Sequence, residues 1–477
     1  MDNEQSLKKP AIVGLAALAV LLAGAVVFYR ERLFTDASYI VFNIINSSDL
    51  SIQGRRYGSF ITQLAPYLSV KAHLPFKFIL QAYSVSFNLF YVIVAGLIAF
   101  KLKQYRLAII MVLHFFLFVT ASYFWPVSEI HQALAWMFLL VGSTMYMGST
   151  GVRFFLLVIF YLLLTFLTVF THFIVIIPAI FLVTYFILEK TYWPFSRRKT
   201  VLLGCMFIFA IGVKYTISLS QSYDGQHLHD AIDFLQHETG GVFAAPVTQM
   251  FFQRCLVIYW PAIIVFIAGI ASLVVSRKFL LAAWTCLSVA GYIMVMWAMY
   301  GKLDRDVQLF HIESEWTSLS IIISTPFVFS FLPRLKPATS SLLLALIFVI
   351  RLAYIGAAAP VFFDRLHLQE QILSQMRKKH VSKLALFMDR ATTSAYIIPW
   401  TAPYESLFSS AMNGDRPQLT FSLVNKDDKQ TRATLANNPA CFDNVFSMMP
   451  KKDMNARYFN IDTTQPYVEM TYEELFK

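Results

Sequence analysis

One carboxylate and two guanidinium groups lie in the polar stretch that follows the first long apolar segment: Asp36, Arg55 and Arg56. A carboxylate at the membrane surface can act as a general base for an attacking hydroxyl group. A guanidinium can bind a phosphate and stabilise the negative charge that develops as the phosphate leaves. These residues predict sugar transfer from a lipid phosphate, with Asp36 as the base. The alternative is a solvated loop carboxylate.

Two further polar side chains lie next to apolar segments on the same expected side. Glu129 follows Trp125-Pro126 at the start of an apolar segment. We expect it to bind the acceptor, or to assist a metal ion, in the same cavity as Asp36. The helix dipole favours a carboxylate at any helix start, so that alternative stays open. His172 lies in a tight turn between two apolar segments, where it could contact substrate or be an ordinary interfacial residue.

Two cations lie within apolar segments, where charged side chains are rare. Lys214 lies near the outer end of the expected span 200–217, and Arg351 lies inside the expected span 339–358. An arginine in such a span usually pairs with a partner or meets a ligand. We predict that both cations bind substrate phosphate. The alternative for Arg351 is that its side chain extends to the nearby membrane interface.

A divalent metal ion is the only cofactor that the sequence suggests. On a helix, His229, Asp233 and His237 would share one face at i, i+4 and i+8, and such ligands can hold zinc or a similar ion. Histidine-rich and acidic loops also occur without metal. The chain contains no Walker motif, HExxH or GxSxG. ATP-driven transport and serine hydrolysis are therefore not favoured.

The segments that must position these side chains are strongly apolar. Apolar residues make up 57% of the 477 residues and charged residues only 14%, whereas soluble domains carry about 25% charged residues. The apolar residues occur in runs of about 20, the length that crosses a bilayer. We predict an α-helical polytopic membrane protein with about eleven spans. These spans are 11–29, 80–100, 107–124, 131–148, 154–171, 173–188, 200–217, 255–275, 279–299, 316–333 and 339–358.

The net charge of +11 does not indicate nucleic-acid binding, because most basic residues form short clusters between apolar runs. Such clusters mark the cytoplasmic side of a membrane protein. The clusters that would share this side are Lys8-Lys9, Lys101 to Arg106, Arg153, Lys190 to Lys199, Arg277-Lys278 and Arg334 to Lys336. We therefore expect a cytoplasmic N-terminus, an extracytoplasmic C-terminus and location in a bacterial cytoplasmic membrane.

Two domains are expected. Residues 1–358 would form the transmembrane domain, with outer loops 30–79 and 218–253, and the first loop is apolar enough to contain short interfacial helices. Residues 359–477 would form a small extracytoplasmic α+β domain. Helical periodicity covers residues 365–379, and short strands are predicted at 384–389 and 394–398.

The order of features at the N-terminus resembles the GT-C superfamily of membrane glycosyltransferases. A first helix precedes Asp36, Tyr39 follows at +3, and a long outer loop ends in Pro66-Tyr67-Leu68 before the second helix. The resemblance implies a polyprenyl-phosphate or polyprenyl-diphosphate sugar donor, a glycan, lipid or protein acceptor, and Asp36 as the catalytic residue. Ala37 stands where many members carry a second acidic residue.

Three alternative functions stay open. The sequence also resembles polysaccharide polymerases of the O-antigen or exopolysaccharide type, which combine an early Asp-x-x-Tyr with a Gln-x-x-Ala, here Gln132 to Ala135, and a later histidine, here His172. The long C-terminal tail favours the transferase instead. A transporter or flippase of lipid-linked sugars is less favoured, because no repeated halves are visible. An assembly protein whose tail binds a partner is the fourth hypothesis.

Overall fold

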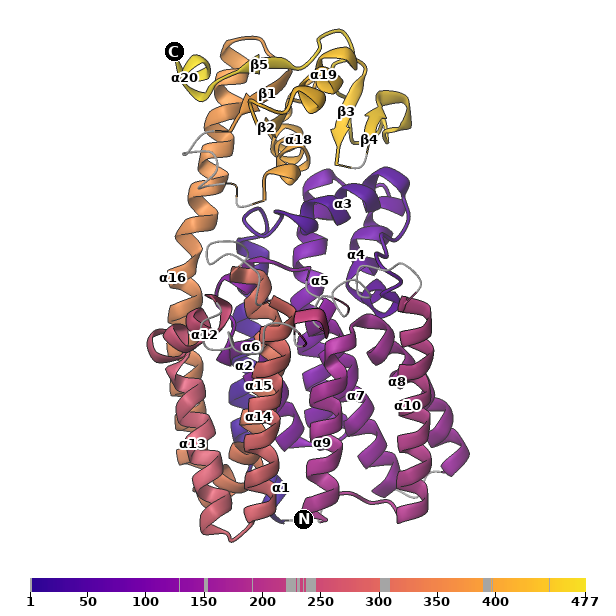
Figure 1. Ribbon diagram of the computed structural model, residues 1–477, viewed down its shortest axis with the longest axis vertical. Coiled ribbons are helices and arrows are strands. Elements are labelled where there is room, and N and C mark those ends of the chain that lie inside the picture. The colour runs from indigo at the N-terminus through magenta and orange to yellow at the C-terminus, as the bar shows by residue number, and fades with distance from the viewer. Residues whose placement is uncertain are drawn as a thin grey trace.

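The computed structural model describes residues 2–127, 129–149, 153–190, 192–219, 229, 232–234, 236, 246–300, 309–388, 396, 398–445 and 447–477. A long bundle of helices carries a small α+β domain on one end (Figure 1). The N-terminus lies at the far end of the bundle, and the C-terminus lies in the small domain (Figure 1).

Among the described residues, seven helical stretches are long and apolar enough to cross a membrane. They are Lys8–Val27, Phe76–Lys101, Phe154–Thr171, Arg197–Ile217, Phe279–Tyr300, Phe310–Arg334 and Pro337–Lys378. Their outward faces expose large apolar side chains, among them Phe155, Phe209 and Leu342. Contiguous apolar surface of this extent is unfavourable in water and favourable against hydrocarbon. The chain is therefore an α-helical integral membrane protein.

The remaining predicted spans also coincide with helices, but these are shorter, bent or more polar. Helix α6 (Tyr105–Leu117) has 13 residues, α9 (Ile176–Glu189) has 14, and α7 (Glu129–Ser149) is not among the seven. Helices α12 (Pro246–Val257) and α13 (Trp260–Val275) meet at 86° and could form an eighth span together. The total of about eleven spans and their orientation stay predictions.

The basic clusters of the sequence lie at helix ends near the N-terminus of the bundle. Arg106, at the start of α6, lies 4.8 Å from the centre of the Tyr192 ring, beyond the end of α9. Lys278, before α14 (Phe279–Tyr300), forms an ion pair with Glu189. The clusters thus gather at one end of the bundle, as the charge pattern predicts. Which side of the membrane this end faces is still a prediction.

The expected outer loop 30–79 contains two short helices, α3 (Asp36–Ser47) and α4 (Phe60–Lys71), as predicted. They lie between the bundle and the C-terminal domain (Figure 1). The Phe42 ring of α3 lies 5.2 Å from the rings of both Phe442 and Phe459. The Asn455 side chain donates a hydrogen bond to the carbonyl of Ile45 at 2.8 Å. Helix α3 is therefore packed into the C-terminal domain.

The C-terminal domain is built on a parallel sheet with the order β2-β1-β5, formed by β1 (Lys383–Phe387), β2 (Thr420–Val424) and β5 (Val468–Met470). The central strand β1 is almost wholly buried, which suits its apolar sequence. The domain also contains α18 (Ala402–Asn413), α19 (Lys429–Asn437), α20 (Tyr472–Phe476) and an antiparallel pair, β3 (Cys441–Asn444) and β4 (Ser447–Pro450).

Strand β1 confirms the strand predicted at 384–389, whereas most of the strand predicted at 394–398 lies outside the described residues. Helix α16 (Pro337–Lys378) connects the bundle to the sheet (Figure 1). Its 42 residues span about 63 Å and pass without a break through the expected domain boundary at 358–359. The helical pattern predicted at 365–379 is the last part of this helix.

Candidate functional site

A polar cavity of about 350 Å³ lies among the first outer segment and the ends of α7, α8, α14 and α15 (Leu309–Pro326). It is lined by Asp36, Gln53, Gly54, Arg56, Trp125, Val127, Glu129, Ile130, His172, Met299, Tyr300, His311, Ser314 and Glu315. A volume of this size is typical of small-molecule sites. Carboxylates, a guanidinium and imidazoles face the same space, so the cavity can bind charged and hydroxyl-bearing groups.

Four of the residues predicted from the sequence meet in this cavity. Asp36 begins α3, Arg56 lies before α4, Glu129 begins α7, and His172 follows α8 (Phe154–Thr171). In the sequence Asp36, Glu129 and His172 lie near the ends of apolar segments and Arg56 lies in the outer segment 30–79, and the fold brings all four together. The convergence of these four residues is the main feature of the site.

Asp36 is held at the first turn of α3, where the helix dipole favours a negative charge. Burial and, to a smaller extent, the neighbouring Glu129 carboxylate raise the pKa of the Asp36 carboxyl to about 6, and His311 and Arg56 oppose the shift. A carboxyl group with this pKa is mostly ionised at neutral pH and still basic enough to accept a proton.

Arg56 and Glu129 form an ion pair at 2.9 Å, with both side chains about 15% exposed. The local backbone separates Arg56 from Arg55. Gly54 and Arg55 have positive φ angles of 55° and 58°, which turn the chain. Of the two arginines, only Arg56 lines the cavity. Arg55 is exposed, and its guanidinium lies 3.5 Å from the Ile217 carbonyl oxygen.

Close packing at Gly58 fixes this segment against α8. The Trp136 indole donates a hydrogen bond to the Gly58 carbonyl at 3.1 Å. A Cβ atom at position 58 would lie 1.8 Å from the hydroxyl oxygen of Thr171 and 2.8 Å from the carbonyl oxygen of Leu167. Only glycine allows this approach. Gly58 thus sets the distance between Arg56 and the end of α8 that carries His172.

Substituting Gly58→Ala is expected to destabilise the protein by about 1–3 kcal/mol, the usual effect of forcing an extra methyl group into a packed contact. The measurement is thermal unfolding of the purified protein in one detergent. The matched control is Gly204→Ala in α10 (Arg197–Leu219), where no atom lies within 4 Å of the added carbon. Equal melting temperatures for the two variants would contradict the close contact.

The structure adds two titratable residues that the sequence did not single out. Helix α15 begins at Leu309, before the expected span at 316–333, and brings His311 and Glu315 to the cavity. Their side chains lie 3.7 Å apart, one helical turn from each other. The Trp125 ring packs 5.3 Å from the His311 ring. One signal was present: residues 302–325 contain no glycine or proline that would end a helix.

Besides Arg55, two predicted phosphate-binding cations, Lys214 and Arg351, do not line the cavity. The Lys214 ammonium is buried and lies 5.7 Å from the centre of the Phe170 ring. Arg351 is also buried, and its guanidinium donates to the carbonyls of Phe116 at 2.7 Å, Val119 at 2.8 Å and Ile258. Three carbonyls thus occupy the Arg351 guanidinium, which indicates a structural role, and the predicted phosphate contact stays a prediction.

Glu313 completes this internal support. Its buried carboxylate accepts hydrogen bonds from the backbone amides of Thr120 at 3.0 Å and Ser122 at 2.9 Å. Arg351 donates to carbonyls at and just after the end of α6 and between α12 and α13, and Glu313 accepts from amides of the irregular stretch that follows α6. Non-helical backbone inside a membrane protein needs such partners, because lipid supplies none. These two charges in the apolar helices are therefore explained by the backbone that they satisfy.

Within the described residues, no group of three or more His, Cys, Asp or Glu side chains is arranged to hold a metal ion. His237, the third member of the predicted metal set, lies outside those residues, and the side chains of His229 and Asp233 are exposed. The divalent ion stays a prediction.

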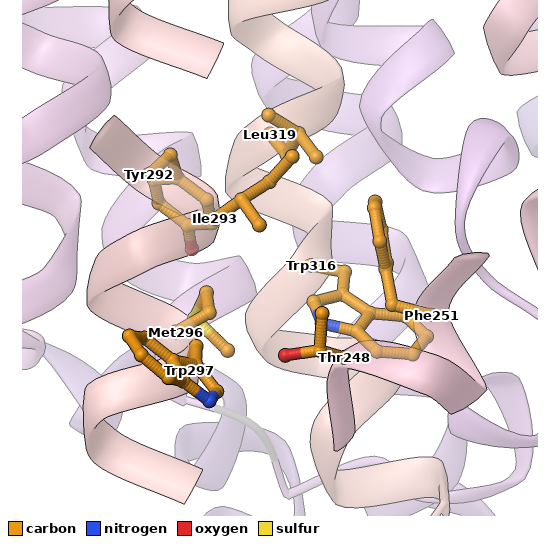
Figure 2. A pocket seen from close by; sticks show the side chains of 8 residues that line it. All are labelled: Thr248, Phe251, Tyr292, Ile293, Met296, Trp297, Trp316 and Leu319. Carbon is orange, nitrogen blue, oxygen red and sulfur yellow. The ribbon is translucent and has the colours of Figure 1, made fainter. Parts of the chain in front are cut away.

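Two other cavities differ in character from the polar one. A void of about 10 Å³ between α12, α14 and α15 holds at most about one water molecule. Figure 2 shows the side chains around it: Thr248, Phe251, Tyr292, Ile293, Met296, Trp297, Trp316 and Leu319. A cavity of about 340 Å³ among α7, α8, α9 and α10 is almost entirely apolar, and Ile180 and Ile208 at its edge are exposed.

Comparison of the chain with protein-family models, curated proteins and solved structures found no match. The function is therefore argued from the cavity and its side chains.

Proposed function

We propose that the protein is a membrane glycosyltransferase that uses a polyprenyl-phosphate or polyprenyl-diphosphate sugar. The observation that carries the proposal is the convergence of Asp36, Arg56, Glu129 and His172 in one cavity. The cavity combines a base, cations for a phosphate and further polar groups for sugar hydroxyls. The acceptor is a glycan, lipid or protein, and a growing glycan as acceptor would make the protein a polysaccharide polymerase.

The proposed reaction is a direct displacement at the anomeric carbon with inversion. Asp36 accepts the proton of the acceptor hydroxyl while the hydroxyl oxygen bonds to the anomeric carbon. The bond between this carbon and the phosphate oxygen breaks, and the phosphate oxygen keeps the electron pair. Arg56 and the imidazoles of His172 and His311 stabilise the departing phosphate. Rate acceleration requires that these groups bind the departing phosphate more strongly than the intact donor.

Two features support a lipid-linked donor. The basic clusters at the opposite end of the bundle favour an extracytoplasmic position of the cavity under the positive-inside rule. The apolar cavity among α7, α8, α9 and α10 offers a surface for a hydrocarbon chain. The proposed location is the cytoplasmic membrane of a bacterium, with the donor headgroup entering the polar cavity and its chain remaining in the bilayer.

The test compares lipid-linked and surface glycans of cells that lack the protein and carry one of three versions: wild type, Asp36→Asn or Asp49→Asn. Asp49 is the matched control, because it is an exposed carboxylate in the same outer segment and does not line the cavity. We expect one glycan signal in mass spectra to be restored by wild type and Asp49→Asn only, at equal protein amounts. Full restoration by Asp36→Asn would overturn the proposal.

One observation favours proton-linked transport as a second candidate. Below the cavity, His131 Nδ1 lies 3.4 Å from His114 Nε2 in the buried interface of α6 and α7. Buried ionisable side chains between membrane helices often mark proton paths. Purified protein in detergent separates the two candidates, because a transferase joins donor and acceptor without a membrane. A transporter would give no product in that assay.

A further inference from the structure

The backbone immediately before Asp36 has an unfavourable conformation. Thr35 has φ 50° and ψ −136°, a combination that is rare for a β-branched residue and that glycine adopts readily. Its hydroxyl group is buried without a hydrogen-bond partner in the described part of the chain. The Thr35 side chain therefore does not explain the conformation, and something outside the segment must hold it.

The partner is a carboxylate of the C-terminal domain. Glu405, buried in α18, accepts the backbone N–H of Thr35 at 3.0 Å and the hydroxyl of Thr401 at 2.8 Å with one oxygen. Its other oxygen forms an ion pair with Arg365 of α16. Both oxygens are thus used, and a glutamine at this position would offer one acceptor where two are needed.

Arg365 contacts the same segment a second time. Its guanidinium lies 4.6 Å from the centre of the Phe34 ring. The Phe34 ring is buried and packs against Phe310 of α15 and Phe362 of α16, at 5.3 Å and 5.1 Å between ring centres. The side chain of Phe34 and the amide of Thr35 are therefore both fixed by residues near the junction of α16 and α18.

We propose that Glu405 and Arg365 are positioning residues for Asp36: they hold residues 34–36 in the conformation that directs the Asp36 carboxylate into the cavity. The inference rests on the proposed function of Asp36. It assigns the C-terminal domain a part in the active site, although none of the described residues of that domain lines the cavity. The domain acts through the backbone, since the Thr35 amide and the Asp36 side chain belong to consecutive residues.

The experiment uses full-length protein in detergent and needs no substrate for its first readout. Glu405→Gln is expected to raise hydrogen exchange of backbone amides in residues 34–39 at least tenfold. The matched control is Asp415→Asn. Asp415 pairs with Arg377 of α16 at 2.8 Å, so its loss weakens the same domain without touching residues 34–36. Unchanged exchange in Glu405→Gln, or an equal rise in Asp415→Asn, would overturn the positioning role.

The second readout is rescue by Thr35→Gly. Glycine prefers the observed backbone angles by itself, so this change should restore at least part of the transfer activity lost in Glu405→Gln. If Glu405 only stabilised the C-terminal domain, Thr35→Gly would not restore the activity lost in Glu405→Gln. A failed rescue would therefore contradict the proposal. Transfer activity tests the proposed function separately. Increased exchange in Glu405→Gln together with undiminished glycans would mean that Glu405 and Arg365 hold residues 34–36, but that this contact does not serve catalysis.

Discussion

Sugar transfer by the purified protein is expected to slow about tenfold for each pH unit below about 6. The reason is the Asp36 carboxyl, whose pKa is raised to about 6 by burial and by the Glu129 carboxylate. A general base must be unprotonated, so activity is present above this pKa and is lost as pH falls through it. The measurement is the initial rate against pH with the lipid-linked donor that the glycan comparison identifies.

Two variants make this prediction specific. Glu129→Gln removes a negative neighbour and releases Arg56 from its ion pair, and both changes lower the pKa of Asp36. The acidic limb of the profile should therefore move to lower pH, whatever happens to the maximal rate. Asp36→Asn should remove the limb and reduce the rate by about 10²–10⁴-fold. A limb that persists in Asp36→Asn, or one that stays in place in Glu129→Gln, would assign the titration to another group.

Arg351→Met is expected to have the largest effect on stability. The substitution leaves the carbonyls of Phe116, Val119 and Ile258 without their donor, and each orphaned buried group costs about 1–3 kcal/mol. The total is comparable with the whole stability of a typical protein, about 5–15 kcal/mol. Thermal unfolding in detergent should show a large drop in melting temperature or failure to accumulate in the membrane.

Arg334→Met is the control for that measurement. Arg334 is exposed at the opposite end of the bundle and donates to the Ser272 carbonyl at 2.9 Å, where solvent can replace it. Its loss should change the stability far less. If Arg351→Met kept its melting temperature and only weakened donor binding, the phosphate contact predicted from the sequence would be right and the structural role wrong.

The sequence was sufficient for those features that depend on local pattern. Runs of apolar residues predicted the membrane helices, and short helices in the first outer segment followed from its composition. Asp36, Glu129 and His172 could be singled out because each is a polar residue near the end of an apolar run, and Arg56 because it is a cation in the same outer segment as Asp36. Their meeting in one cavity was expected only on the assumption that these run ends share one side of the membrane.

Features that depend on distant partners could not be predicted. Arg351 looks like a ligand-binding charge in the sequence, because the three carbonyls that it satisfies belong to segments far from it along the chain. His311 and Glu315 were not singled out, because hydropathy begins the expected span at residue 316 and the helix begins at Leu309. Nothing near Thr35 in the sequence indicates that Glu405 binds its amide.

The contact between the Thr35 amide and Glu405 also depends on the order in which the chain is synthesised. Thr35 and Glu405 are 370 positions apart, and a ribosome adds about 5–20 residues per second. The segment that carries Asp36 therefore enters the membrane roughly 20–70 s before the carboxylate that holds it has been synthesised. A chain that is released early would insert its helices but lack the contact between Glu405 and the Thr35 amide. Under the proposed function, only a chain that has been extended past Glu405 would then transfer sugar from a lipid-linked donor.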